Sequence, residues 1–174
     1  MNLLRQGSKQ QQITWVLFII YMTILTWVIL FKFQLPFTFV EHVRSVNMLP
    51  YSQSLVTNGR VNFFELVMNA VVFVPLGVYA GLLFRKWSWG KKSLLFAGVS
   101  FAFELLQFIF AMGRSDITDI INNFLGAVIG VLLYLLLGQL CKTKERTNRV
   151  VNILAIIITV LLLSNFAIMT FYNA

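Results

Sequence analysis

The sequence contains five long apolar stretches, each close to the roughly 20 residues that an α-helix needs to cross a bilayer. They cover residues 13–31, 64–84, 93–112, 117–140 and 151–171. A soluble domain of this size would lack the polar surface that water requires, because 59% of the chain is hydrophobic and only 11% is charged. The pattern predicts an all-α, polytopic membrane helix bundle with about five transmembrane helices. We expect residues 1–174 to form a single membrane domain.

The basic residues between these stretches are unequally distributed. Of the 14 Lys and Arg residues, ten precede the first stretch or lie at 85–92 and 142–149, and four lie on the opposite side. The positive-inside rule therefore predicts a cytoplasmic N-terminus, an extracytoplasmic C-terminus and an extracytoplasmic loop at residues 32–63. A net charge of +8 placed in this way indicates membrane orientation and not a nucleic-acid partner. The loop is rich in aromatic residues, and we expect it on the membrane surface, either as an interfacial lid or as part of a binding site.

Polar residues within three of the predicted spans lie at similar depths. With this orientation, Asn69 and Asn123 lie about 8 and 9 Å inside the extracytoplasmic face, at 1.5 Å per helical residue. In the third span, Gln107 lies about 8 Å and Glu104 about 12 Å below the same face. The spacing of Glu104 and Gln107 puts both on one side of their helix. The sequence therefore predicts a polar site near the extracytoplasmic ends of these spans.

Charged residues are expected at the same face. Asp116 and Asp119 belong to the side of the fourth span that carries Asn123, and Arg114 and Arg44 are nearby extracytoplasmic cations. An intramembrane carboxylate is costly unless it is protonated, hydrated or paired, so its presence suggests a site. An Arg guanidinium suits phosphate, and a neighbouring carboxylate would orient it. The structural alternative is that the polar side chains only join helices, at about 0.6 kcal/mol for each hydrogen bond.

Small residues follow the polar ones along two of the spans. Gly77 and Gly81 in the second span, and Gly126 and Gly130 in the fourth, are each four residues apart. Such pairs allow helix backbones to approach closely in lipid, so we expect the second, third and fourth spans to pack together. Pro75 removes a backbone donor within the second span and is expected to kink it.

Cysteine and histidine chemistry have little support in this chain. Cys141 is the only cysteine and His42 the only histidine, which excludes an intrachain disulfide and the usual zinc-site spacings. We therefore assign no cofactor and no metal ion.

Taken in order, the motifs resemble those of the VanZ-like membrane proteins. They are Asn69-x3-Phe73-x-Pro75-x-Gly77, Glu104-x2-Gln107, Arg114-Ser115-Asp116-x2-Asp119, Asn123-x2-Gly126 and the Arg-x2-Asn-x2-Pro element at 44–50. The resemblance covers about residues 31–140. It implies a plasma-membrane protein of the cell envelope, found largely in Gram-positive bacteria, in a family whose founding member is associated with low-level teicoplanin resistance. The ligand-binding candidates that it implies are Arg44, Asn47, Asn69, Glu104, Gln107, Arg114, Asp116, Asp119 and Asn123.

Three functions fit these observations. The leading hypothesis is a protein that binds or handles a phosphate-bearing lipid or lipid-linked envelope precursor and contributes to teicoplanin or lipoglycopeptide resistance, and we expect such a binding protein more than an enzyme. The second is a metal-dependent enzyme acting on a lipid phosphate, with Asp116, Asp119 and Glu104 as ligands or as acid and base. The third is a lipid transporter or flippase, against which the apolar inner halves of the second and fourth spans argue. The oligomeric state is left open.

Overall fold

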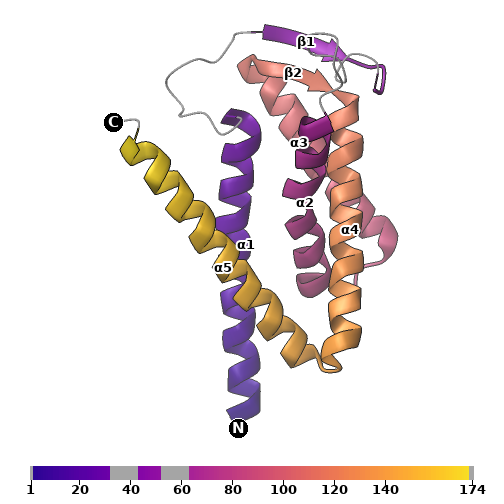
Figure 1. Cartoon of the computed structure of the whole chain (residues 1–174). Helices are drawn as coiled ribbons and strands as arrows, with labels where there is room; N and C mark the ends of the chain where they lie inside the picture. Colours follow the sequence, from indigo (N-terminus) through magenta and orange to yellow (C-terminus); the bar gives the residue numbers. More distant parts are fainter. Residues whose placement is uncertain (1, 32–42, 52–62, 173–174) are drawn as a thin grey trace. The chain divides into compact units, whose positions relative to one another are not determined.

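The computed structural model describes residues 2–31, 43–51 and 63–172, and five helices account for most of them (Figure 1). They are α1 (Asn2–Phe31), α2 (Phe63–Leu83), α3 (Trp89–Phe110), α4 (Ile117–Cys141) and α5 (Lys144–Tyr172). All five are long and apolar enough to cross a membrane. The predicted all-α membrane fold with five transmembrane helices is therefore confirmed. The predicted orientation of the termini stays a prediction.

One helix boundary differs from the prediction in a way that matters for the site. The third apolar stretch was expected to continue to residue 112, but α3 ends at Phe110. Ala111 adopts the left-handed conformation with φ 54°, and its N–H donates to the carbonyls of Gln107 and Phe108. This capping arrangement ends the helix and lets the chain turn. Hydropathy cannot detect such an end, because Met112 is as apolar as the helix before it.

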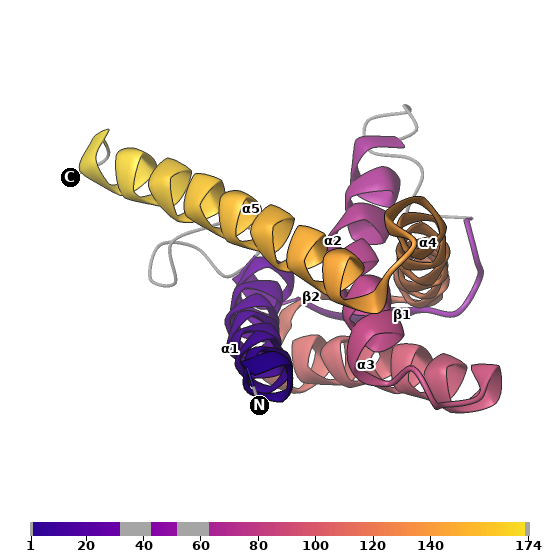
Figure 2. The same ribbon diagram turned by 90° about the horizontal axis from the view of Figure 1, so that it is seen from below.

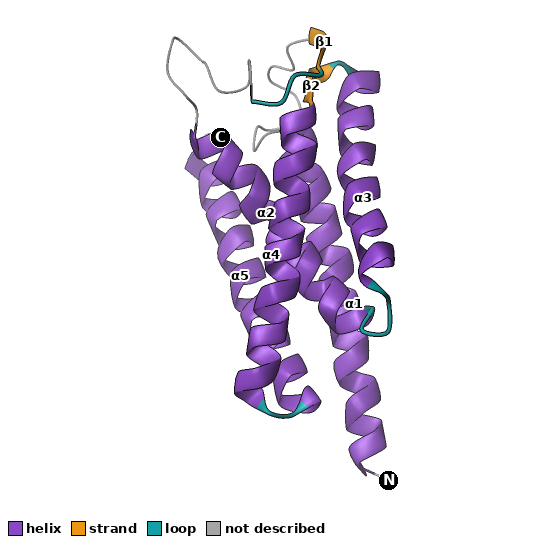
Figure 3. Cartoon of the chain, turned by 90° about the vertical axis from the view of Figure 1, so that its right-hand side faces the viewer, coloured by secondary structure: helices purple, strands orange, loops and turns teal. Residues whose placement is uncertain are grey.

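A two-stranded parallel sheet, which the sequence did not predict, joins two segments expected to be loops. Strand β1 (Val43–Asn47) lies within the expected loop 32–63, and β2 (Met112–Asp116) connects α3 to α4. The register pairs Val43 with Met112 and Asn47 with Asp116. Figure 3 shows the sheet at the opposite end of α2 and α3 from the connection between these two helices. The rest of the expected loop lies outside the described residues.

The chain divides into two compact units. The first comprises Met1–Met22 and Leu136–Ala174. Within it, α5 contacts the first part of α1 through buried polar side chains. The Thr14 hydroxyl hydrogen-bonds to Asn152 Oδ1 at 3.0 Å, and Asn152 Nδ2 donates to Gln10 Oε1 at 3.1 Å. Thr14 and Asn152 are 1% and 3% exposed, so these hydrogen bonds are shielded from water.

The second unit, Thr23–Leu135, contains the sheet and the predicted site. Its apolar core includes Phe73 from α2 and Phe96 from α3, neither of which has any measurable exposure. The rings of Phe73 and Phe103 meet edge to face, with centroids 6.3 Å apart. This aromatic contact packs α2 against α3.

Helices α2 and α4 lie side by side in two perpendicular views (Figures 1 and 2), and their backbones touch at glycines. A Cβ atom placed on Gly77 would lie 1.8 Å from the Ala127 carbonyl oxygen, and one on Gly126 would lie 1.9 Å from that of Ala70. At Gly130 the distance to the Val74 carbonyl oxygen would be 2.0 Å. A side chain at any of these positions would force the helices apart.

Gly81 and Pro75, the other two residues expected to shape helix packing, lie in α2. A Cβ on Gly81 would lie 2.4 Å from the Tyr134 ring, so this glycine accommodates an aromatic side chain of α4. Pro75 lies within α2, where it cannot donate a backbone hydrogen bond to the preceding turn. The close approach of α2 and α4 also brings Asn69 of α2 near Asp119 of α4.

Candidate functional site

Most of the predicted site residues gather at the sheet end of the second unit, where α3, β2 and α4 follow one another. Asn47, Glu104 and Asp116 are only 7%, 5% and 4% exposed. We call these three residues, together with Asn69 and Asp119, the carboxylate cluster. It brings together groups from both strands and from α2, α3 and α4.

Asp116 occupies the centre of this cluster because it ends β2 and precedes the first residue of α4. Its side chain accepts a hydrogen bond from the Thr118 N–H through Oδ1 at 2.8 Å and one from Asn47 Nδ2 through Oδ2 at 2.9 Å. The first bond is the usual N-terminal cap of a helix, in which a carboxylate satisfies a backbone donor and interacts favourably with the helix dipole. The second bond ties β1 to the same point. Asp116 therefore has a structural role as well as a place in the site.

Glu104 is held by β2. Its Oε2 accepts the backbone N–H of Asp116 at 2.9 Å, and its own carbonyl accepts the Ser115 hydroxyl at 2.9 Å. The sequence left a cation, a proton or water as alternatives for stabilising this carboxylate, and the structure adds a backbone N–H of β2 to its surroundings. A hydrogen bond to the ionised form lowers the cost of burying a carboxylate. Glu104 thus fixes the position of β2 relative to α3.

Two further pairs join the helices below the sheet. Asn69 Nδ2 donates to Asp119 Oδ1, which connects α2 to α4. Asn123 Nδ2 donates to the Ser100 hydroxyl at 2.9 Å, which connects α4 to α3. These contacts give both asparagines a structural role in helix packing.

Gln107 contacts a different helix. Its Nε2 donates to the backbone carbonyl of Ile29 at 2.9 Å. Ile29 lies in the last turn of α1, where the carbonyl groups have no partner within their own helix. Gln107 therefore accompanies the end of α1, while its own buried Oε1 has no hydrogen-bond partner within residues 2–31, 43–51 and 63–172.

Arg44 and Arg114 lie in the sheet, at neighbouring positions of its ladder. Arg114 is paired with Ser45, and Arg44 is paired with Gly113. Arg114 is two positions before Asp116 in β2. The backbone thus places both arginines on the two strands that the carboxylate cluster holds, while their side chains lie outside the described part of the structure.

Three residues that the sequence analysis did not select join β1 to α4. The Tyr51 N–H donates to the Thr118 hydroxyl at 3.0 Å, and the Tyr51 hydroxyl donates to Asn122 Oδ1 at 3.4 Å. Thr118 and Asn122 are four residues apart and so lie one turn apart on one face of α4. This spacing was the only signal available, because nothing in the sequence indicated that residues 47–51 would cross that face.

Within the described ranges, no group of three or more His, Cys, Asp or Glu side chains is placed to hold a metal ion. The site is instead a network of carboxylates, amides and hydroxyls at one end of a helix bundle.

These features define a multi-pass membrane protein in which a short parallel sheet caps the helices over buried carboxylates. A family model described as VanZ/LLP1 matches residues 18–138, and the chain belongs to that family. It is also similar to Protein VanZ of Enterococcus faecium, with 34% identity over 146 residues. The aligned region covers 83% of this chain and 86% of that protein. No solved structure matches the chain.

Proposed function

We propose that the sheet end of the second unit binds a phosphate-bearing lipid or a lipid-linked envelope precursor at the extracytoplasmic face of the plasma membrane. Through this binding the protein contributes to teicoplanin or lipoglycopeptide resistance, the property that its family suggests. Arg44 and Arg114 would bind the phosphate, and the carboxylate cluster would hold the strands that carry them.

One observation carries this proposal, namely the fixed position of β2. Asp116 is bound through its backbone to Glu104 and through its side chain to Asn47 and Thr118. Arg114 lies two residues earlier in β2, a strand whose end is hydrogen-bonded both to α3 and to β1. An anchored strand suits ligand binding, because less conformational freedom is lost when the ligand is bound.

The charge distribution favours arginine as the phosphate ligand. A helix N-terminus is often an anion site, but the N-terminus of α4 already has Asp116 as its cap and Asp119 in its first turn. A phosphate placed there would meet two carboxylates. A guanidinium on the sheet provides the cation that such a phosphate requires, in a planar geometry that can bind two of its oxygens.

The proposal is tested by the teicoplanin susceptibility of bacteria that express the full-length protein at equal membrane abundance. We expect Arg114→Ala to lose the resistance that the wild type confers, and Arg114→Lys to retain only part of it, because lysine keeps the charge without the planar fork. Arg149→Ala is the matched control, since Arg149 is an exposed arginine in α5 far along the chain from the sheet. Wild-type resistance in Arg114→Ala would refute the proposal.

A further inference from the structure

Asn122 carries a buried amide donor near the sheet end of α4. Its side chain is 8% exposed, and its buried Nδ2 has no hydrogen-bond partner among the residues that the structure describes. An unmet polar group in such a place destabilises the folded state. The neighbouring amide, Asn123, has its Nδ2 bound to Ser100. The two adjacent amides therefore differ in whether their donors are satisfied by described residues.

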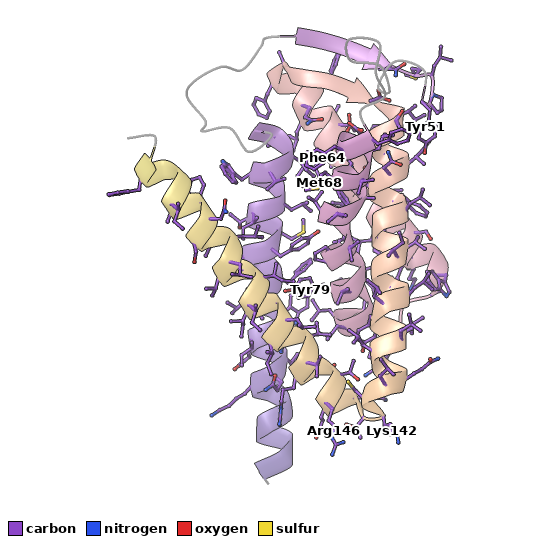
Figure 4. The ribbon with its side chains drawn as sticks, in the orientation of Figure 1. Tyr51, Phe64, Met68, Tyr79, Lys142 and Arg146 are labelled. Carbon is purple, nitrogen blue, oxygen red and sulfur yellow. The ribbon has the colours of Figure 1, made fainter. Side chains whose placement is uncertain are left out.

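Tyr51, which lies against Asn122, is held through its N–H by Thr118, but its hydroxyl makes a long hydrogen bond. The Tyr51 hydroxyl reaches Asn122 Oδ1 at 3.4 Å, well beyond the usual O–H···O distance of about 2.7–2.8 Å. Tyr51 also has a φ of 58°, in the left-handed region that a bulky residue rarely adopts. Figure 4 shows Tyr51 beside the sheet end of α4. Strained residues of this kind often lie at ligand sites.

The segment that carries Tyr51 has a polar side and an apolar side. Asn47 binds Asp116, and its Oδ1 also accepts the Leu49 N–H at 3.2 Å, which forms a tight turn. The side chains of Met48 and Leu49 are 74% and 66% exposed. An amphiphilic molecule fits this arrangement, with its hydrocarbon chain beside the exposed side chains and its head group toward α4.

We propose that Asn122 is a ligand contact, whose Nδ2 donates a hydrogen bond to an uncharged oxygen of the lipid head group when Tyr51 moves aside. This inference rests on the proposed function and refines its ligand. Asp119, one turn before Asn122, and the Asp116 cap disfavour an anionic oxygen at this point. A hydroxyl or ether oxygen of a sugar or glycerol group meets no such repulsion. The preferred ligand therefore carries a neutral, oxygen-rich group beyond its phosphate.

The test compares two probes that differ only in this group. Full-length protein in detergent is titrated with polyprenyl phosphate and with a polyprenyl phosphate bearing one sugar, and dissociation constants are obtained from the rise in Tm. A second arm compares phosphatidic acid with phosphatidylglycerol of the same chain length, which distinguishes a sugar from a glycerol source. We expect the wild type to bind the sugar- or glycerol-bearing member of at least one pair about three- to tenfold more tightly, the effect of one neutral hydrogen bond.

Asn122→Leu is expected to abolish this preference and to leave the affinity for the bare phosphate lipid unchanged. Its Tm without ligand should equal or exceed that of the wild type, because an unmet buried amide has been replaced by an apolar group. If Asn122→Leu does not fold, Asn122→Ala provides the same comparison with a smaller side chain. Gln139→Leu is the matched control, as it replaces an exposed amide of the same helix.

Two failures are distinguishable. Equal binding of polyprenyl phosphate and uncharged polyprenol by the wild type, with no effect of Arg114→Ala, would refute the proposed function and this inference with it. Phosphate-dependent binding that Arg114→Ala weakens, without any head-group preference or with one that survives in the Asn122 variants, would refute only the inference. A fall in Tm with an unchanged preference would identify Asn122 as a packing residue.

Discussion

The packing of α2 against α4 provides the sharpest prediction. In Gly126→Ala, the new Cβ would lie 1.9 Å from the Ala70 carbonyl oxygen, whereas real Cβ contacts essentially never fall below 3.0 Å. The two backbones must therefore separate by at least about 1.1 Å, the difference between these distances. Such overpacking costs about 1–3 kcal/mol, and the obstacle here is backbone that cannot rotate away.

The matched control is Gly98→Ala in α3. A Cβ at Gly98 meets nothing within 4 Å, so only the helix propensity changes. Alanine is favoured over glycine by about 1 kcal/mol within a helix, and this gain applies to both variants. We expect Gly98→Ala to be stabilised by up to this amount. Because the propensity gain is common to both variants, the free energy of unfolding of Gly98→Ala should exceed that of Gly126→Ala by the overpacking cost, about 1–3 kcal/mol.

The assay is the equilibrium unfolding of the full-length protein in mixed detergent micelles, followed by tryptophan fluorescence and circular dichroism. Both variants are compared with the wild type under one condition. If Gly126→Ala were as stable as Gly98→Ala, the close contact between α2 and α4 would not exist. The packing of α2 against α4 would then not support the sheet.

Three further predictions concern the polar contacts. Asp116→Ala should lower the free energy of unfolding by about 2–4 kcal/mol, because α4 loses its cap and Asn47 loses its acceptor. A double-mutant cycle with Asn47→Ala should show a coupling energy above about 0.5 kcal/mol. Ser100→Ala should destabilise the protein by about 0.6–2 kcal/mol in the same unfolding assay, since Asn123 is left without an acceptor; equal stability would argue against this hydrogen bond. Asn152→Leu should weaken the contact between α5 and the start of α1, and faster hydrogen exchange of the α5 amides would reveal it, whereas unchanged exchange would contradict it.

The membrane fold could be predicted because lipid imposes a requirement that acts on each segment separately. Backbone groups in hydrocarbon must be hydrogen-bonded within the segment, and about 20 apolar residues span the bilayer. The predicted 117–140 agrees with α4 (Ile117–Cys141) to within one residue at each end. The predicted 93–112 differs from α3 (Trp89–Phe110) because a left-handed cap at Ala111, and not a change in hydropathy, ends the helix.

The site was only partly accessible to such reasoning. Helical spacing placed Glu104 and Gln107 on one face, but the structure joins Glu104 to the Asp116 backbone and Gln107 to the Ile29 carbonyl. Spacing specifies a direction from one helix and does not identify the neighbour in that direction. Asn122 was overlooked because Tyr51, which hydrogen-bonds to its side chain, lies 71 residues earlier in the chain.

The amino-acid sequence by itself determined that this chain forms membrane-spanning helices and that polar residues interrupt them toward one end, because both are properties of single segments. Tertiary structure decided that two expected loops pair as β1 and β2 and that Asp116 becomes the point where strands and helices meet. Those contacts link residues far apart in the chain. Their geometry depends on the packed helices and strands together, including the contact of α2 with α4 at their glycines, and not on any one segment.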